Sequence, residues 1–169
     1  MPSDSFRNTK LENLDLSYNE FQVMPNSALT DVSETLRYLN LSFNQIQHLD
    51  STMFSNTLKL ISLSLSNNRL TILPDNIFMG LSSLLTLDLS HNPIRANFKE
   101  LFHYTQRLKE LRLSHTSLQS VPSLPLPGTS HQQHLIYWFI IESVVVVKRL
   151  NFSKIKQKLK KTKFCTKIA

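Results

Sequence analysis

LENLDLSYNEF, the stretch at residues 11–21, decides the fold because its frame returns four more times along the chain. The frame has leucine at its first, fourth and sixth positions, asparagine at its ninth and an apolar residue at its eleventh. It starts again at residues 36, 60, 84 and 108, so the spacing is 24 to 25 residues. A repeat of this length is typical of stacked units that bury their leucines against one another.

Each copy predicts one turn of a coil. Its Leu-x-Leu core has a period of two, which indicates a short strand whose leucines point inward while the residues between them point out. Parallel strands need a long return, and each repeat is long enough for a strand and that return. The sequence therefore predicts an α/β solenoid that is right-handed, with a parallel sheet on the concave face and a short helical or irregular convex side.

Asparagine ends the expected strand in four copies, at Asn19, Asn44, Asn68 and Asn92. A carboxamide both donates and accepts hydrogen bonds, so it can satisfy backbone groups that the turn leaves buried. Stacked at one level, the four predict a structural ladder rather than a catalytic site. The fifth copy has Thr116, whose shorter side chain reaches fewer backbone groups and predicts a weaker turn.

The return half of the frame also repeats. Its fourteenth and fifteenth positions read Met24-Pro25, Leu49-Asp50, Leu73-Pro74, Asn97-Phe98 and Val121-Pro122. Its nineteenth position reads Leu29, Phe54, Phe78 and Phe102. These residues predict a Leu-Pro corner and an aromatic spine inside the coil, and Phe6 is expected to be the spine residue of an earlier turn.

With these residues, segment 11–122 resembles the typical extracellular class of the leucine-rich repeat family, which has Leu-Pro at the corner and Phe behind it. It lacks the Gly-x-Ile-Pro signature of the plant receptor class. The strand wording, from LDLSYNEF to LRLSHTSL, is similar to that of chaoptin-type adhesion proteins of insect photoreceptors and of Toll-type receptor ectodomains. The resemblance implies a curved solenoid outside the cell, membrane-attached in many members, that binds other proteins or itself.

The positive charge of the chain belongs to one end of it. Residues 1–147 hold 10 Lys and Arg against 12 Asp and Glu, a formal charge of −2, whereas residues 148–169 hold 9 Lys and Arg and no acid. The sequence pI of 9.7 therefore gives no argument for nucleic-acid binding by the repeats. The single cysteine, Cys165, excludes an intrachain disulfide.

The resemblance implies disulfide-bonded caps and a signal peptide in extracellular members, and the sequence has neither. Uncapped solenoid ends expose their core. We therefore expect an interior run of repeats from a longer secreted or membrane-anchored protein, so that the location is extracellular or at the cell membrane. The alternative, which the missing cysteines favour, is a complete cytosolic repeat protein.

The frame divides the chain into a partial preceding repeat (1–10), five repeats (11–122), a linker (123–134) and an apolar run with a basic tail (135–169). The apolar run has 13 residues, Leu135–Val147, with Glu142 inside it, whereas a membrane span needs about 20. Its β-branched stretch Val144–Val147 indicates a strand. For residues from about 129 we prefer translated non-coding or out-of-frame sequence, and the alternatives are a short membrane anchor and a disordered tail.

Function is expected on the outward positions of the strand face. The candidate contact residues are Asp15, Tyr18, Tyr38, Phe43, Asp88, His91, Arg112 and His115. Tyr18, Tyr38 and Phe43 fall on adjacent turns and are expected to cluster as aromatic anchors. The serine at the seventh frame position recurs in all five copies, which predicts a structural role beside the asparagine turn. Asn40-Leu-Ser42 is a glycosylation sequon, and we expect a glycan on Asn40 if the parent protein is secreted.

The sequence gives no support for catalysis or for a cofactor. His91 and His115 occupy the same frame position in successive turns, but two histidines without a nearby cysteine make a thin metal site. The chain has 2 glycines, which leaves no glycine-rich phosphate loop. Nothing in the frame places Ser, His and Asp as a triad. We therefore expect a protein that is not an enzyme.

The expected face is small, because five strands about 4.8 Å apart and about 13 Å long cover about 300 Å². A stable interface buries about 800 Å² per partner, so these repeats alone should bind weakly. The sequence and its resemblance favour protein recognition, with cell adhesion as the first hypothesis. The partner is then a protein, homophilic binding included, with no nucleic acid and with membrane attachment through other parts of the parent. The alternatives are an innate-immune receptor ectodomain and an intracellular scaffold.

Overall fold

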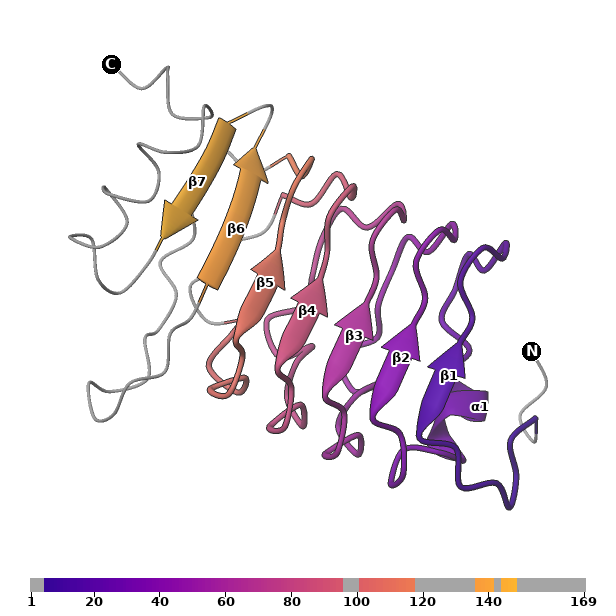
Figure 1. The fold of residues 1–169 in the computed structure, drawn as a ribbon. Coiled ribbons are helices and arrows are strands. Elements are labelled where there is room, and N and C mark those ends of the chain that lie inside the picture. The colour runs from indigo at the N-terminus through magenta and orange to yellow at the C-terminus, as the bar shows by residue number, and fades with distance from the viewer. Residues whose placement is uncertain (1–4, 96–100, 118–135, 142–143, 149–169) are drawn as a thin grey trace.

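The computed structural model describes residues 5–95, 101–117, 136–141 and 144–148. Within them, strands β1 to β7 form one sheet in chain order (Figure 1). The strands are β1 (Asn13–Asp15), β2 (Tyr38–Asn40), β3 (Ser62–Ser64), β4 (Thr86–Asp88), β5 (Glu110–Arg112), β6 (Ile136–Ile141) and β7 (Val144–Lys148). Strands β1 to β6 pair in parallel, and β7 pairs antiparallel to β6.

The register of the first five strands is that of the sequence frame. Leu14 pairs with Leu39 and so on to Leu111, so equivalent positions lie side by side on successive turns. The middle leucine is buried in β2 to β5, and the residues on either side of it are half-buried or exposed. The parallel-strand solenoid that the frame predicts is therefore confirmed.

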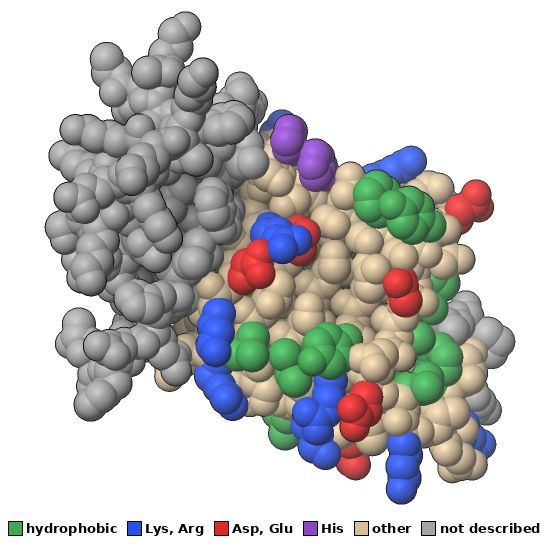
Figure 2. Space-filling model, in the orientation of Figure 1, with side chains coloured by type: hydrophobic (Ala, Val, Ile, Leu, Met, Phe, Trp, Pro, Cys, Tyr) green, Lys and Arg blue, Asp and Glu red, His purple; other side chains and the backbone are tan. Residues whose placement is uncertain are grey.

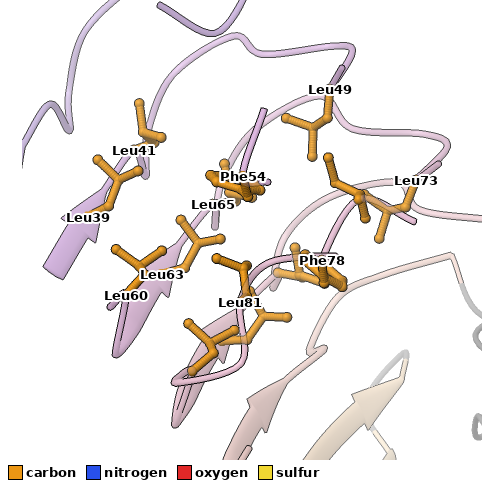
Figure 3. Packing of buried hydrophobic residues seen from close by; sticks show 14 of the residues in the cluster. Leu39, Leu41, Leu49, Phe54, Leu60, Leu63, Leu65, Leu73, Phe78 and Leu81 are labelled. Atoms are coloured by element: carbon orange, nitrogen blue, oxygen red, sulfur yellow. The ribbon is translucent and has the colours of Figure 1, made fainter. Parts of the chain in front are cut away.

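The core lies between the strands and the return loops. Figure 3 shows strand leucines such as Leu63 and Leu65 directed toward Phe54 and Phe78, which come from the loops behind the sheet. Both phenylalanines are fully buried, and the rings of Phe78 and Phe102 stack with centroids 5.7 Å apart. The aromatic spine thus lies inside the coil. The corner residues Met24, Leu49 and Leu73 are also buried. Two expected corners, 97–98 and 121–122, lie outside the described residues.

The convex side contains little helix. Among the described residues the one helix is α1 (Asn26–Thr30), which follows Pro25 and buries Ala28 and Leu29. This helix is too short to cross a membrane, and the described residues hold no longer one. The later turns return through loops closed by three-residue backbone hydrogen bonds, such as Thr57 N–H to Phe54 O at 3.0 Å.

The chain before β1 has the contacts of a return loop. Phe6 packs against the core, and both the backbone N–H and the hydroxyl of Thr9 donate to the Phe6 carbonyl. Thr57 makes the same two bonds to the carbonyl of the spine residue Phe54. These contacts agree with the interpretation of Phe6 as the spine residue of an earlier turn.

The asparagines at the ninth frame position of the second, third and fourth turns each connect two turns. The side-chain N–H groups of Asn68 donate to Leu65 O and Ser66 O in its own turn and to Leu41 O in the turn before, at 2.9–3.2 Å. Its side-chain oxygen accepts the Ile46 N–H at 3.0 Å. Asn44 and Asn92 repeat this set of bonds. The carboxamides therefore tie neighbouring turns together where the strands end.

Thr116 cannot make the full set of bonds that Asn44, Asn68 and Asn92 make at the same frame position. Its hydroxyl donates to Leu113 O at 2.9 Å and makes no bond to the turn before it. The Ile94 N–H, which would meet a carboxamide oxygen, donates instead to Asn92 O at 2.8 Å.

Replacing Thr116 by asparagine is expected to raise the free energy of unfolding by about 1 kcal/mol, because it adds bonds to Leu89 O and to the Ile94 N–H. Urea denaturation of the whole chain measures the change. Thr116→Val is the control, since it removes the present bond to Leu113 and should lower stability. If the asparagine variant is no more stable than the valine variant, a carboxamide at this position does not stabilise the contact between turns.

The structure extends the sheet beyond the fifth repeat. Residues 136–141 and 144–148 form β6 and β7, although the sequence suggested that residues 135–169 are disordered or not native. The strand at 144–148 agrees with the β-branched run of valines. The exposed edge of β5 gives β6 a template for pairing, because an edge strand presents free N–H and C=O groups. The linker at 123–134 and the basic tail lie outside the described residues.

Candidate recognition surface

The outward residues of the strand face form straight columns across the sheet. Strand alternation directs the third and fifth frame positions away from the core, and the parallel register puts equivalent residues next to each other. The fifth position reads Asp15, Asn40, Ser64, Asp88 and Arg112. We call these residues the central ladder, since several of them bond across turns.

The acidic members of the central ladder hold fixed positions. One oxygen of Asp15 accepts the Ser17 N–H at 2.8 Å, and the other accepts the Asn40 side chain at 3.2 Å. Hydrogen bonds from Ser17, first from its hydroxyl and then from its backbone, lower the pKa of Asp15, and the bond from Asn40 adds to them. Asp88 caps the Ser90 N–H in the same way, at 2.9 Å. Asp15 therefore presents a negative charge on an otherwise polar face.

Arg112 closes the central ladder in a small ion cluster. Its guanidinium lies 2.7 Å from a carboxylate oxygen of Glu110 and 3.7 Å from one of Asp88. The hydrogen bond to Glu110 raises the pKa of Arg112, and the charges of Glu110 and Asp88 act in the same direction. The two acids and one base leave this part of the face with a net negative charge. Arg112 is thus paired within the chain and is a weaker contact candidate than the sequence suggested.

The eighth frame position forms a second column, which we call the exit column because it follows the end of each strand. It comprises Tyr18, Phe43, Asn67, His91 and His115. All five have a positive φ of 54° to 55°. Bulky residues rarely adopt this left-handed conformation, which glycine and asparagine adopt with less strain. This backbone conformation could not be predicted from the sequence, because four of the five residues are neither glycine nor asparagine.

Two pairs of rings stack along the exit column. Tyr18 and Phe43 lie with ring centroids 4.3 Å apart and planes 6° apart, and Tyr18 is 75% exposed. Figure 2 shows a hydrophobic group and a separate histidine group along one edge of this face. Tyr38 does not join them, because it lies at the start of β2, five residues before Phe43. The expected cluster of three aromatics is therefore a pair, and the third ring lies at the other end of the strand.

The histidine pair does not form a metal site in this geometry. The imidazoles of His91 and His115 stack with centroids 4.2 Å apart and planes 11° apart. Parallel rings direct their nitrogen lone pairs along parallel lines, whereas two ligands of one tetrahedral ion must converge on it. No third metal-ligating side chain joins them among the residues that the structure describes.

The sequon at Asn40 lies in the central ladder. The Asn40 side-chain oxygen accepts both the N–H and the hydroxyl of Ser42, at 3.1 Å and 2.6 Å, while its amide group donates to Asp15. Ser42, Ser66 and Ser90 are buried beside the asparagine turn, in agreement with a structural role for this serine column. Glycosylation of Asn40 stays a prediction.

The structure also points to two residues that were not among the candidate contact residues. Ile61 and Leu85 occupy the second frame position and stay half-buried at the edge where the strands begin. In the other turns this position holds Glu12, Arg37 and Lys109, all of them exposed. The signal in the sequence is two apolar residues at a frame position that is charged in the other turns.

Two family models match parts of the chain. A model described as leucine rich repeat matches residues 34–94, and a second model of the same description matches residues 7–22. A search of curated proteins gives no match.

Three similar solved structures are complexes. The Toll–Spatzle complex, described as a molecular hub in Drosophila development and innate immunity, has a chain 27% identical over 71% of this chain, with a TM-score of 0.64. The TLR13–ssRNA13 complex gives 38% identity over 62%, with a TM-score of 0.57. The LRIM1/APL1C complex gives 29% identity over 72%, with a TM-score of 0.67. This chain spans 17%, 14% and 23% of those chains, respectively.

Proposed function

We propose that the described turns are leucine-rich repeats that form the recognition segment of an extracellular cell-adhesion protein of the chaoptin-like kind. In this proposal the solenoid keeps the outward columns of the strand face in register, and these columns bind a protein partner. For adhesion the partner is a second copy of the same protein on a neighbouring cell. Leucine-rich repeat scaffolds are generally non-enzymatic, which agrees with a role in binding.

The exit column carries this proposal. Its ring side chains occupy left-handed positions where asparagine, as at Asn67, would be less strained. The Tyr18–Phe43 stack lies mostly outside the core, with Tyr18 75% and Phe43 43% exposed. Backbone conformation does not call for rings at these positions and the core does not need them. Large exposed aromatics are common anchors of protein interfaces, so a binding role accounts for them.

A receptor ectodomain is the second candidate, and the similarity to Toll and TLR13 favours it. In that case the same surface binds a soluble ligand instead of a second copy. The Toll and LRIM1 structures are complexes with protein partners, whereas the TLR13 structure contains single-stranded RNA. Homophilic adhesion predicts that the chain binds a second copy of itself, whereas a receptor role does not.

A bead-clustering experiment tests the proposal. Beads coated densely with the chain compensate for a small interface, because many weak contacts act together. Beads with the natural chain are expected to cluster, and beads with the double variant Tyr18→Asn and Phe43→Asn are expected to lose most of that clustering. Asparagine removes both rings yet suits the left-handed backbone, as Asn67 shows, so the fold should persist.

Ile72→Asn is the matched control, since Ile72 is 69% exposed but lies beyond the asparagine turn and outside the strand face. It should leave clustering intact. Clustering that survives loss of both rings would rule out the exit column as the contact surface. No clustering by the natural chain would overturn homophilic adhesion and leave the receptor candidate.

A further inference from the structure

A second surface lies at the opposite edge of the strand face, where the strands begin. Backbone hydrogen bonds join the second frame position of successive turns: Ile61 N–H to Arg37 O at 2.7 Å, Leu85 N–H to Ile61 O at 2.8 Å and Lys109 N–H to Leu85 O at 2.8 Å. Tyr38, which is 47% exposed, directly follows Arg37 and pairs with Ser62, the residue after Ile61. Three apolar residues, Tyr38, Ile61 and Leu85, thus lie on three successive turns at the edge where the strands begin, and we call them the entry stripe.

The entry stripe is not part of the core. The core of these turns consists of leucines at the first, fourth and sixth frame positions, and in the second to fourth turns every one of them is buried. Ile61 and Leu85 directly precede β3 and β4, stay half-buried and do not belong to the core cluster. At a half-buried position outside the core, folding alone does not require an aliphatic side chain. The stripe thus leaves apolar surface open in the middle of the described sheet.

Cations border the stripe. Lys59, Arg107 and Lys109 are exposed and make no ion pair with any residue that the structure describes. Arg37, by contrast, is paired with Glu12 at 3.3 Å. Figure 2 shows a row of hydrophobic side chains with Lys and Arg side chains beside it along this edge. The unpaired positive charge therefore belongs to the second, fourth and fifth turns.

We propose that the entry stripe binds an acidic segment of a protein partner, with apolar side chains of that segment on Tyr38, Ile61 and Leu85 and its carboxylates beside Lys59, Arg107 and Lys109. This inference rests on the proposed function, because it takes protein recognition as given and assigns a partner chemistry. An apolar centre inside a charged rim is the usual anatomy of a protein interface. The free cations select acidic partners and speed their association.

The composition of the stripe favours a protein over a nucleic acid. Single-stranded nucleic acid binds where a basic groove carries several ring faces on which successive bases stack. Here Tyr38 is the one aromatic of the stripe, and its other two members are aliphatic. Leucine or valine side chains of a peptide match Ile61 and Leu85 better than bases do.

Fluorescence anisotropy with the whole chain tests the inference. The probe is a short labelled peptide of leucines and glutamates, compared with its counterpart in which lysine replaces every glutamate and with poly(U) RNA. We expect the acidic peptide to bind, its affinity to fall with added salt, and the lysine peptide to bind at least about tenfold more weakly. Failure of the acidic peptide to bind, equal affinity for both peptides, or tighter binding of RNA would each overturn the inference.

Two sets of variants locate the site. The double variant Lys59→Glu and Lys109→Glu should weaken the acidic peptide about tenfold, since two exposed attractions become repulsions. Leu85→Ser should weaken it by removing apolar contact, while Arg69→Glu, an exposed cation elsewhere on the chain, should not. If the Lys59/Lys109 and Arg69 variants lower the affinity for the acidic peptide equally, the net charge of the chain accounts for binding, which would contradict a defined site.

The inference and the proposed function fail in different ways. If the acidic peptide does not bind but bead clustering still depends on Tyr18 and Phe43, recognition stands and the entry stripe is excluded. If neither surface responds, protein recognition by the strand face is overturned as well.

Discussion

Replacing Asn68 by alanine is expected to lower the free energy of unfolding by about 3–5 kcal/mol, because a buried carboxamide that joins two turns is lost. Asn68 is 7% exposed and bonds to three carbonyls and one N–H group. Leu41 O keeps a second bond from Asn44, and Leu65 O keeps one from Asn92. The Ile46 N–H has no other partner among the described residues, so alanine leaves it buried and unpaired.

Urea denaturation of the whole chain measures the loss, with Asn19→Ala as the matched control. Asn19 holds the same frame position in the first turn, but it is exposed and donates to Leu16 O and Ser17 O of its own turn alone. Its replacement should cost about 1 kcal/mol or less, because water can satisfy the groups that it leaves. Equal losses in the two variants would show that connecting two turns adds no stability.

Replacing Phe78 by alanine should cost about 3–5 kcal/mol, since a fully buried ring leaves a cavity that the surrounding loops fill only in part. The ring stacks on Phe102 and packs below the strand leucines (Figure 3), so its loss weakens contacts between turns as well as within one. Stability in a repeat stack depends on contacts between neighbouring turns, and the transition should therefore broaden as well as shift.

Met79→Ala is the control for Phe78, because Met79 is the next residue and is 37% exposed. It should change the free energy of unfolding by less than about 1 kcal/mol, which is usual for surface positions. A Phe78 variant that unfolds at the same urea concentration as the Met79 variant would show that the aromatic spine contributes little to stability.

The sequence predicted the parts of the fold that depend on period. Leucines two residues apart located strands β1 to β5, and asparagine at a fixed offset located the turns that follow them. The burial of Phe54, Phe78 and Phe102 followed from their common frame position. These features are repeated, so each copy supports the interpretation of the others. The weaker turn expected at Thr116 came from comparing one copy with the rest.

The sequence could not predict features that occur once or that depend on backbone conformation. Gly80 has a φ of 99°, and a Cβ there would lie 2.4 Å from the backbone oxygen of Phe54. The glycine is thus needed for a close approach between two loops, and no other copy of the frame repeats it. The left-handed backbone of the exit column could not be predicted for a related reason. Tyr, Phe and His rarely adopt a positive φ, whereas glycine adopts it readily.

The candidate surface was predicted in outline and corrected in detail. Tyr18 and Phe43 stack as expected of neighbouring turns, but Tyr38 lies at the other end of its strand, where it pairs with Ser62. The repeat frame predicts which residues lie side by side on successive turns, but not how far apart two frame positions lie along a strand. In the structure the expected aromatic cluster is divided between the two ends of the strands.

Photo-crosslinking is the most direct test of protein recognition by the strand face. A photoreactive phenylalanine analogue in place of Phe43, in cells that express the natural chain, probes the exit column, and the same analogue in place of Ile72 probes an exposed position outside it. Recognition predicts a discrete protein cross-link from position 43, to a second copy for adhesion or to another protein for reception, and none from position 72. Equal labelling from both positions, or none from position 43, would contradict the account.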